Sequence, residues 1–183
     1  QSGPASWPEL AGQLAAAVRK HDTRHTIIIA AHGGLRDGQW VPRHQGFTYL
    51  VPPRDIANIV FEDHIYNPQE YAEKGLGTYP GIFRTQGKPA YWNKTKLRET
   101  LQPILDFQHK YNVPIYIGEF APNITVSDGG VVYLRDIVSL FEEYHWAWTF
   151  HSYRTARIYD VNKAPALRSE EHTSELQSPM YLV

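Results

Sequence analysis

Val113-Pro114-Ile115-Tyr116-Ile117-Gly118-Glu119-Phe120 is the stretch of sequence that decides the fold. Its short apolar run predicts a strand buried on both faces, as in parallel sheets that are covered by helices. The strand ends at a glycine and a carboxylate, and packing gives no reason for Glu119 to stand there. In barrels of parallel strands, this end of a strand carries the active site. Glu119 is therefore a candidate catalytic residue; the alternatives are an ordinary loop residue or half of a buried ion pair.

Helical and strand patterns alternate on both sides of this stretch. A helix is expected from Ser6 to Lys20, with Ser6 and Glu9 as a capping box and an inward apolar face of Leu10, Leu14, Ala17 and Val18. The other expected elements are strands at 26–31, 56–61 and 146–150, a helix at 95–111 kinked at Pro103, and a helix capped by Ser127 or Asp128. Residues 35–54 and 69–93 are predicted to be long loops. This alternation predicts an α/β fold with a parallel sheet, part of a TIM (β/α)8 barrel.

The end of the chain has a different composition. Residues 168–178 read Arg-Ser-Glu-Glu-His-Thr-Ser-Glu-Leu-Gln-Ser, which resembles the in-frame translation of a sequencing-library adapter. We therefore expect residues 1–166 to form the domain and residues 167–183 to be a disordered artefactual tail without function.

Composition excludes several classes of function. The net charge of −1 offers no general attraction to nucleic acid or to an anionic membrane. No apolar run approaches the roughly 20 residues of a membrane span. The absence of cysteine excludes disulfides and thiolate metal sites. Five tryptophans and twelve tyrosines suit either core packing or stacking against sugars.

Three predicted strand ends carry polar or aromatic side chains. They are His64 with Tyr66, then Glu119, then Trp148 with His151. In a parallel barrel these ends lie on one rim, which suits glycoside hydrolysis. A retaining glycosidase needs a carboxylate nucleophile and a second carboxyl group about 5–5.5 Å away. Hydrogen bonds from His64 and Tyr66 would keep the Glu119 nucleophile ionised and oriented.

Three motifs resemble glycoside hydrolase family 5, the cellulase family. His64-Ile65-Tyr66-Asn67-Pro68 is similar to the His-x-Tyr motif after the sixth strand of the family. Pro114–Phe120 resembles the seventh strand with its nucleophilic glutamate, and Tyr144–Arg154 resembles the eighth. The resemblance covers about residues 5–160. It implies the last four strands of the barrel with their helices, Glu119 as the nucleophile, and His64 and Tyr66 as its catalytic partners.

The same resemblance implies a retaining endoglucanase that acts on β-1,4-glucan without a cofactor. The family's acid/base glutamate stands in an Asn-Glu-Pro motif, and this sequence contains none; the nearest acid, Glu9, fits the capping box better. We therefore expect the chain to be the C-terminal half of a larger enzyme, inactive by itself. An open half-barrel also predicts aggregation or dimerisation through its unpaired edges.

Several side chains are candidates for sugar binding. His151 stands where many family members have a stacking tryptophan, and we favour it over Trp148 because Trp148 continues the apolar alternation of its strand. Trp40 and His32 are the other predicted substrate-binding residues. Further aromatic candidates in the loops are Tyr79, Tyr91 and Trp92. His32, His44, His64 and His151 lack the tight spacing with carboxylates that is typical of metal ligands, so no metal is expected.

Three alternatives remain open. One is a non-catalytic carbohydrate-binding module, one is a β-mannanase or other β-glycanase of the same family, and one is a metal-dependent barrel hydrolase. The expected partner is a β-glucan polysaccharide or oligosaccharide, with no nucleic acid and no membrane, and the whole protein is expected to be a monomer. Secretion is an expectation from polymer-degrading chemistry.

Overall fold

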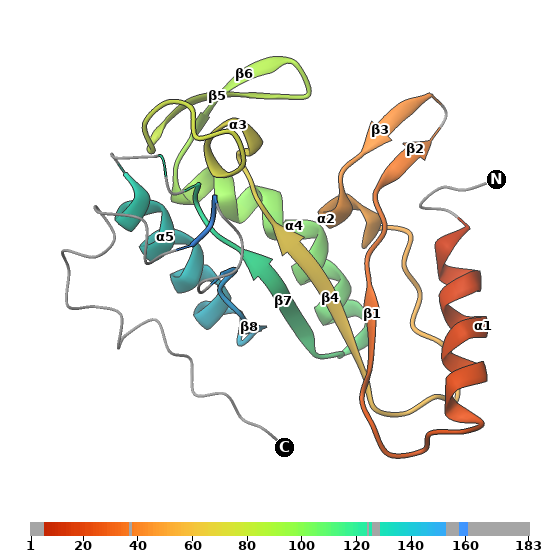
Figure 1. The fold of residues 1–183 in the computed structure, drawn as a ribbon. Helices are drawn as coiled ribbons and strands as arrows, with labels where there is room; N and C mark the ends of the chain where they lie inside the picture. The colour runs from red at the N-terminus through yellow and green to blue at the C-terminus, as the bar shows by residue number, and fades with distance from the viewer. Residues whose placement is uncertain (1–5, 37, 124, 126–128, 153–157, 161–183) are drawn as a thin grey trace. The chain divides into compact units, whose positions relative to one another are not determined.

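The computed structural model describes residues 6–36, 38–123, 125, 129–152 and 158–160. The predicted artefactual tail, residues 167–183, and the predicted helix caps Ser127 and Asp128 lie outside these residues. Within them, the main sheet has four strands in the order β1-β4-β7-β8. The strands are β1 (Ile27–Ala30), β4 (Ile59–Ile65), β7 (Ile115–Phe120) and β8 (Ala147–Trp148). Together with the helices between them (Figure 1), they form the parallel α/β arrangement that the sequence predicts.

The chain divides into two compact units, which we describe one at a time. The first comprises Gln1–His64 and Leu101–Tyr116. In it, β1 and β4 run parallel with Ile27 opposite Ile59 and Ala30 opposite Glu62. The core of this unit contains three aromatic rings, in which Phe107 packs edge-on against Phe47 at 5.2 Å and Phe61 at 4.9 Å. Aromatic burial of this kind is a large share of what stabilises a small core.

Helix α1 (Trp7–Arg19) turns a different face inward from the one predicted. Ala11 and Ala15 are buried, whereas Leu10, Leu14 and Val18 are each about half exposed. Both ends of the helix are fastened. The Trp7 indole N–H donates to the Ala30 carbonyl at 2.7 Å, and the Arg19 guanidinium donates to four carbonyl oxygens, those of Asp22, His25, Ala57 and Asn58.

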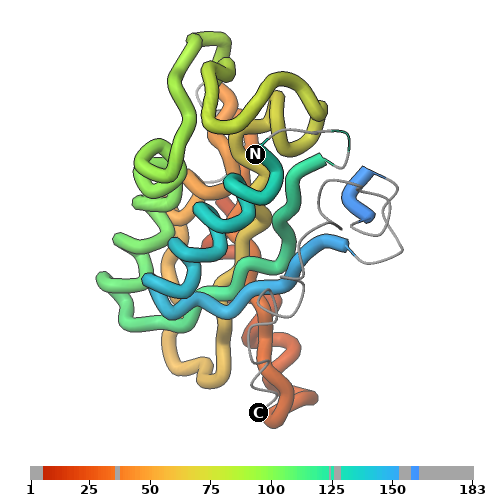
Figure 2. The backbone as a smooth tube through the Cα atoms, turned by 90° about the vertical axis from the view of Figure 1, so that its left-hand side faces the viewer, coloured from red at the N-terminus to blue at the C-terminus, as the bar shows by residue number. Residues whose placement is uncertain are grey.

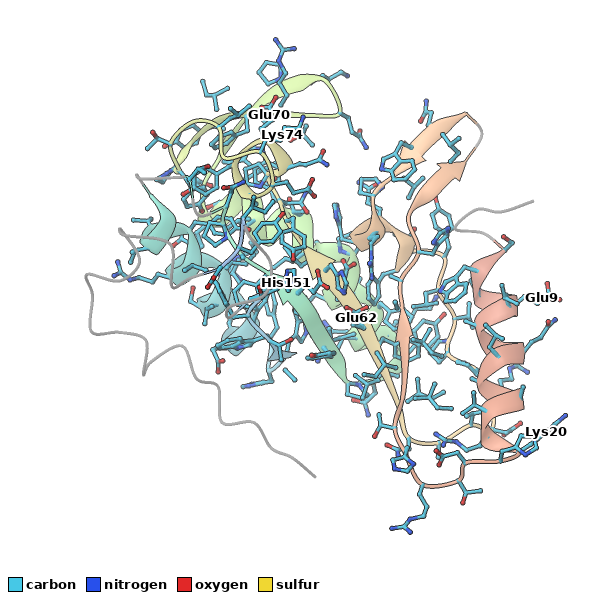
Figure 3. All side chains as sticks on the ribbon, viewed as in Figure 1. Glu9, Lys20, Glu62, Glu70, Lys74 and His151 are labelled. Carbon is cyan, nitrogen blue, oxygen red and sulfur yellow. The ribbon has the colours of Figure 1, made fainter. Side chains whose placement is uncertain are left out.

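These two anchors explain why the smaller residues are buried. Trp7, Ala11, Ala15 and Arg19 are four residues apart in turn, so they share one face of the helix. The contacts of Trp7 and Arg19 direct Ala11 and Ala15 inward. The neighbouring stripe of Leu10, Leu14 and Val18, the leucine stripe, therefore stays half exposed. Figure 3 shows the charged Glu9 and Lys20 on the outer side of the same helix. The predicted capping box is also absent, because Ser6 has helical backbone angles and makes no side-chain cap hydrogen bond.

The first predicted loop contains regular structure. It holds a two-stranded antiparallel hairpin, β2 (Gly34–Arg36) with β3 (Gln39–Val41), and a short helix, α2 (Arg43–Gly46). Strand β4 begins three residues later than predicted and continues to Ile65, so His64 lies within the strand. Glycine is required at position 33, because a Cβ there would lie 2.7 Å from the Val41 carbonyl oxygen.

The second unit comprises Ile65–Thr100 and Ile117–Val183. Its predicted loop also contains structure, namely helix α3 (Gln69–Ala72) and the hairpin β5 (Gly81–Thr85) with β6 (Lys88–Trp92). A cluster of buried rings lies between them, with Tyr71 against Tyr79 at 5.8 Å and against Phe83 at 5.6 Å. These short strands escaped prediction because the glycines and prolines around them dominate the segment.

Helices α4 and α5 follow the prediction closely. Helix α4 (Lys94–Tyr111) contains Pro103 and is capped by the Asn93 side chain, which accepts from the Lys96 N–H. Helix α5 (Gly130–Glu143) has Gly129 as its N-cap residue, with a left-handed φ of 80°. Figure 2 shows α5 running alongside β7, where Phe141 packs edge-on against Phe120 at 5.1 Å. No helix in the described residues combines the length and the apolar character needed to cross a membrane.

The exposed leucine stripe generates a stability prediction. Leu14 is 51% exposed and Leu101 is fully buried in the same unit. Leu14→Ala should lower the free energy of unfolding of the chain by less than about 1 kcal/mol, whereas Leu101→Ala should cost about 2–5 kcal/mol. Urea titrations of the two variants measure this difference. Equal losses would contradict the inward orientation of Ala11 and Ala15.

Candidate functional site

Glu119 lies at the penultimate position of β7 in the second unit. Its neighbours Ile117 and Phe120 are fully buried. The Glu119 side chain keeps 34% of its surface exposed. A carboxylate that is held by a rigid strand and still reached by solvent can meet a substrate in a defined direction.

Tyr66 joins Glu119 to His151. The Tyr66 hydroxyl lies 2.9 Å from Glu119 Oε2 and 2.6 Å from His151 Nδ1. Burial, followed by the hydrogen bond to Glu119, raises the pKa of Tyr66 above its usual range, so the phenol keeps its proton. Because an ionised carboxylate only accepts hydrogen bonds, the Tyr66 O–H donates to Glu119.

Backbone pairing explains why these residues meet. The Thr149 N–H donates to the Ile117 carbonyl at 3.0 Å, and the His151 N–H donates to the Phe120 carbonyl at 3.1 Å. The Thr149 hydroxyl adds a bond of 2.6 Å to the Gly118 carbonyl. The two N–H donors are two residues apart and their acceptors are three apart, so the regular parallel register is interrupted beyond β8. This pairing places His151 beside the end of β7 (Figure 3).

Tyr159 is a site residue that the sequence analysis missed. Its ring packs against Tyr66 at 5.0 Å and against His151 at 5.5 Å. The Ser152 N–H donates to the Tyr159 carbonyl at 3.2 Å. No motif marks this position, and only the high tyrosine content of the chain hinted at it.

His64 belongs to a cluster of charged side chains in the first unit. Its Nε2 lies 2.6 Å from Glu62 Oε1, two residues earlier on the same face of β4. Arg43 approaches both neighbouring acids, with Nη2 3.1 Å from Glu62 Oε2 and Nε 3.2 Å from Asp63 Oδ1. Figure 3 marks Glu62 on this strand. The run Glu62-Asp63-His64 was visible in the sequence, but Arg43 comes from a segment that was predicted to be a loop.

Among the described residues of the first unit, Asp63 and His44 are buried and have displaced pKa values. Burial raises the pKa of Asp63 to about 7, and the nearby Arg43 offsets this only in part. Burial lowers the pKa of His44 to about 4, which keeps the imidazole neutral. Both shifts have the same cause, since burial penalises the charged form of any group.

The other predicted binding residues lie in different surroundings. Trp148 is 7% exposed, packs edge-on against Phe120 and donates from its indole N–H to Glu142 at 2.7 Å, so it belongs to the core. Trp40 is 65% exposed on the β2–β3 hairpin, and His32 is exposed with its ring 6.1 Å from Trp7. Among the loop aromatics, Tyr91 is exposed, while Tyr79 and Trp92 are buried and have no face for a sugar. Within the described ranges, no three His, Asp or Glu side chains are grouped to hold a metal ion.

A comparison of the sequence with models of protein families identifies the family of the chain. The family model "Cellulase (glycosyl hydrolase family 5)" matches residues 1–157. The chain belongs to glycosyl hydrolase family 5. The resemblance seen in the three motifs is thereby confirmed at the level of the family.

Solved structures of family 5 enzymes agree with this assignment. Three of the similar structures are of the Thermotoga maritima endoglucanase Cel5A, and for each the match covers 86% of this chain and 49% of that chain. The structure of the enzyme itself is similar with 25% identity and a TM-score of 0.67. A complex with cellobiose has 23% identity and a TM-score of 0.66, and a complex with mannotriose has 24% identity and a TM-score of 0.62. The chain thus spans about half the length of these family 5 structures. A comparison with curated protein sequences finds no match.

The two displaced pKa values predict opposite effects of pH on stability. The pKa of Asp63 is about 7 when folded against an ordinary 3.8, so its contribution to stability is lost as the pH rises from about 4 to 7. The pKa of His44 is about 4 when folded against an ordinary 6.5, so its contribution is lost as the pH falls from 6.5 to 4.

Two single variants separate these contributions. As the pH rises from 4 to 7, the free energy of unfolding of Asp63→Asn should increase relative to that of the unchanged chain, and that of His44→Gln should decrease. Each change is at most about 1.4 kcal/mol per pH unit. Urea titrations at several pH values give both slopes. Slopes of the same sign in the two variants would contradict the burial of one of the groups.

Proposed function

We propose that the protein containing this chain is a retaining β-glycosidase of the endoglucanase type, with Glu119 as its nucleophile. The observation that carries the proposal is the Glu119 carboxylate at the end of β7, held by the Tyr66 hydroxyl at 2.9 Å. Membership of glycosyl hydrolase family 5 supports the reaction class. The position at a strand end supports the catalytic role, because barrel enzymes build their sites there.

The proposed reaction has two steps. Glu119 attacks the anomeric carbon, the glycosidic C–O bond breaks, and the leaving oxygen takes a proton from a second carboxyl group. Water then attacks the glycosyl-enzyme ester after giving its proton to that same group, and Glu119 is released. The hydrogen bond from Tyr66 holds the Glu119 carboxylate in one orientation and favours its ionised form. In this proposal His64 binds the sugar or helps to orient the nucleophile, and no cofactor takes part.

We propose that the second carboxyl group lies outside these 183 residues. The sequence has no Asn-Glu-Pro motif. Glu9 does not suit the role, because it lies on the exposed side of α1 and accepts from Gln13 at 3.3 Å. The chain by itself is then inactive, and its activity, like its proposed secretion, is a property of the whole protein.

The proposed substrate is a β-1,4-glucan, and a β-mannan is the second candidate. The similar Cel5A structures support both, because one contains cellobiose and another mannotriose. His151 and the exposed Trp40 are the residues of this chain that we propose to contact the sugars. Comparison of kcat/KM on cello- and manno-oligosaccharides of equal length decides between the two substrates.

Covalent labelling of the whole protein tests the nucleophile. A 2-deoxy-2-fluoro cellobioside should leave a glycosyl ester on Glu119, found by mass spectrometry of its peptide. Glu119→Gln should lose labelling and on the order of 10⁴-fold or more in kcat. Glu99→Gln, which removes an exposed carboxylate paired with Lys96, is the matched control and should react normally. Labelling of another carboxylate in the unchanged protein would overturn the proposal.

Removal of the Tyr66 hydroxyl gives a second prediction for the whole protein. Tyr66→Phe keeps the ring and removes the donor to Glu119. We expect kcat to fall by about 10²- to 10³-fold with little change in KM, the typical cost of losing one donor at a reacting group. Tyr111→Phe is the control, because Tyr111 is the last residue of helix α4 and is not a candidate for sugar binding. An equal loss in both variants would exclude a specific role for Tyr66.

A further inference from the structure

The Tyr66 hydroxyl stands between two partners but carries a single proton. Its oxygen lies 2.9 Å from Glu119 Oε2 and 2.6 Å from His151 Nδ1. Suppose that the Tyr66 O–H donates its hydrogen bond to the Glu119 carboxylate. The short contact with His151 is then a hydrogen bond only if Nδ1 carries a hydrogen and donates to the Tyr66 oxygen. The opposite arrangement, with Tyr66 donating to Nδ1, requires a protonated Glu119.

The interaction between His151 and Glu119 runs through Tyr66. His151 Nδ1 and Glu119 Oε2 are 3.6 Å apart, which is too far for a direct hydrogen bond. Both distances to the Tyr66 oxygen lie within hydrogen-bonding range. Hydrogen bonds in such a chain polarise one another, so an N–H that donates to the phenol oxygen makes its O–H a stronger donor.

The surroundings hold the imidazole in this orientation. The backbone N–H of His151 donates to the Phe120 carbonyl at 3.1 Å. The Tyr159 ring packs against the rings of both Tyr66 and His151, and Tyr66 meets His151 nearly edge-on, with interplanar angle 78°. Side chains that are locked from two sides keep hydrogen-bond geometry without an entropic cost at each turnover.

We propose that His151 is a positioning residue for the nucleophile, acting as an Nδ1–H donor to Tyr66, which in turn donates to Glu119. The inference rests on the proposed function for the role of Glu119. It goes beyond a contact with sugar, because it assigns a tautomer to His151 and a direction to the chain His151 → Tyr66 → Glu119. In the neutral Nδ1–H form of His151, Nε2 is an acceptor, and 32% of the side chain is exposed to solvent.

The tautomer can be measured without any activity assay. In the intact protein with ¹⁵N-labelled histidine, long-range ¹H–¹⁵N spectra on the alkaline plateau of a pH titration should show a protonated Nδ1 and an unprotonated Nε2 for His151. The signal is assigned by its loss in His151→Asn. In Tyr66→Phe the imidazole loses its acceptor and should move toward the Nε2–H tautomer, which neutral imidazole prefers in water. An Nε2–H tautomer in the unchanged protein, or the same tautomer balance in Tyr66→Phe, would overturn the proposal.

Kinetics of the intact protein test the positioning role. His151→Ala should lower kcat by about 10- to 100-fold, the scale of a misplaced catalytic group. His151→Asn keeps an N–H donor near the position of Nδ1 and should recover most of that loss. The double variant with Tyr66→Phe should be no slower than Tyr66→Phe alone, because His151 acts through that hydroxyl. Additive losses, or no recovery by asparagine, would overturn the positioning role.

The two proposals fail separately. If the fluoro-glycoside does not label Glu119 in the unchanged protein, the proposed nucleophile is wrong whatever the tautomer of His151. If Glu119 is labelled but His151 carries its proton on Nε2, the glycosidase reading stands and the His151 → Tyr66 → Glu119 chain is wrong.

Discussion

The parallel backbone hydrogen bonds between β7 and residues 149–151 are the constraint on which the candidate site depends. This pairing joins the N–H groups of Thr149 and His151 to the carbonyls of Ile117 and Phe120, and the Thr149 hydroxyl adds a bond to the Gly118 carbonyl between them. It brings the imidazole of His151 beside Glu119, where Tyr66 joins the two. Sites on strands are more precise than sites on loops, so the position of Glu119 at the end of β7 is well defined. The hydrogen-bond direction inferred for His151 follows from this placement and from the single proton of a phenol.

In the first unit, a neighbouring positive charge compensates only part of the cost of burying a carboxylate. Arg43 lies beside Glu62 and Asp63, yet Asp63 is fully buried and its pKa stays raised. An ion pair in such surroundings regains only part of the hydration that both charges lose. Glu62 in turn contacts His64, the first residue of the motif that is similar to the His-x-Tyr of the family.

The predictable parts of the fold were those with long repeating patterns. Helix α4 and helix α5 follow from their apolar spacing, and β7 follows from its β-branched run. The hairpins at 34–41 and 81–92 were missed, because strands of three to five residues carry too few positions for an alternating pattern to emerge. The inward face of α1 was predicted wrongly for another reason. Its leucines make the more apolar stripe, but the anchors at Trp7 and Arg19 turn the alanines inward.

The sequence by itself determined the family, the order of the parallel strands and the identity of the carboxylate at the end of β7, because these depend on local patterns and on motifs within a few residues. Only the tertiary structure decided that Trp148 is a core residue, that Tyr159 packs on the site and that Arg43 joins the acids of β4. The same holds for the link from His151 through Tyr66 to Glu119, residues that are 53 and 85 positions apart along the chain. Contacts over such separations depend on strand register and on the packing of whole elements, and no local pattern contains that information.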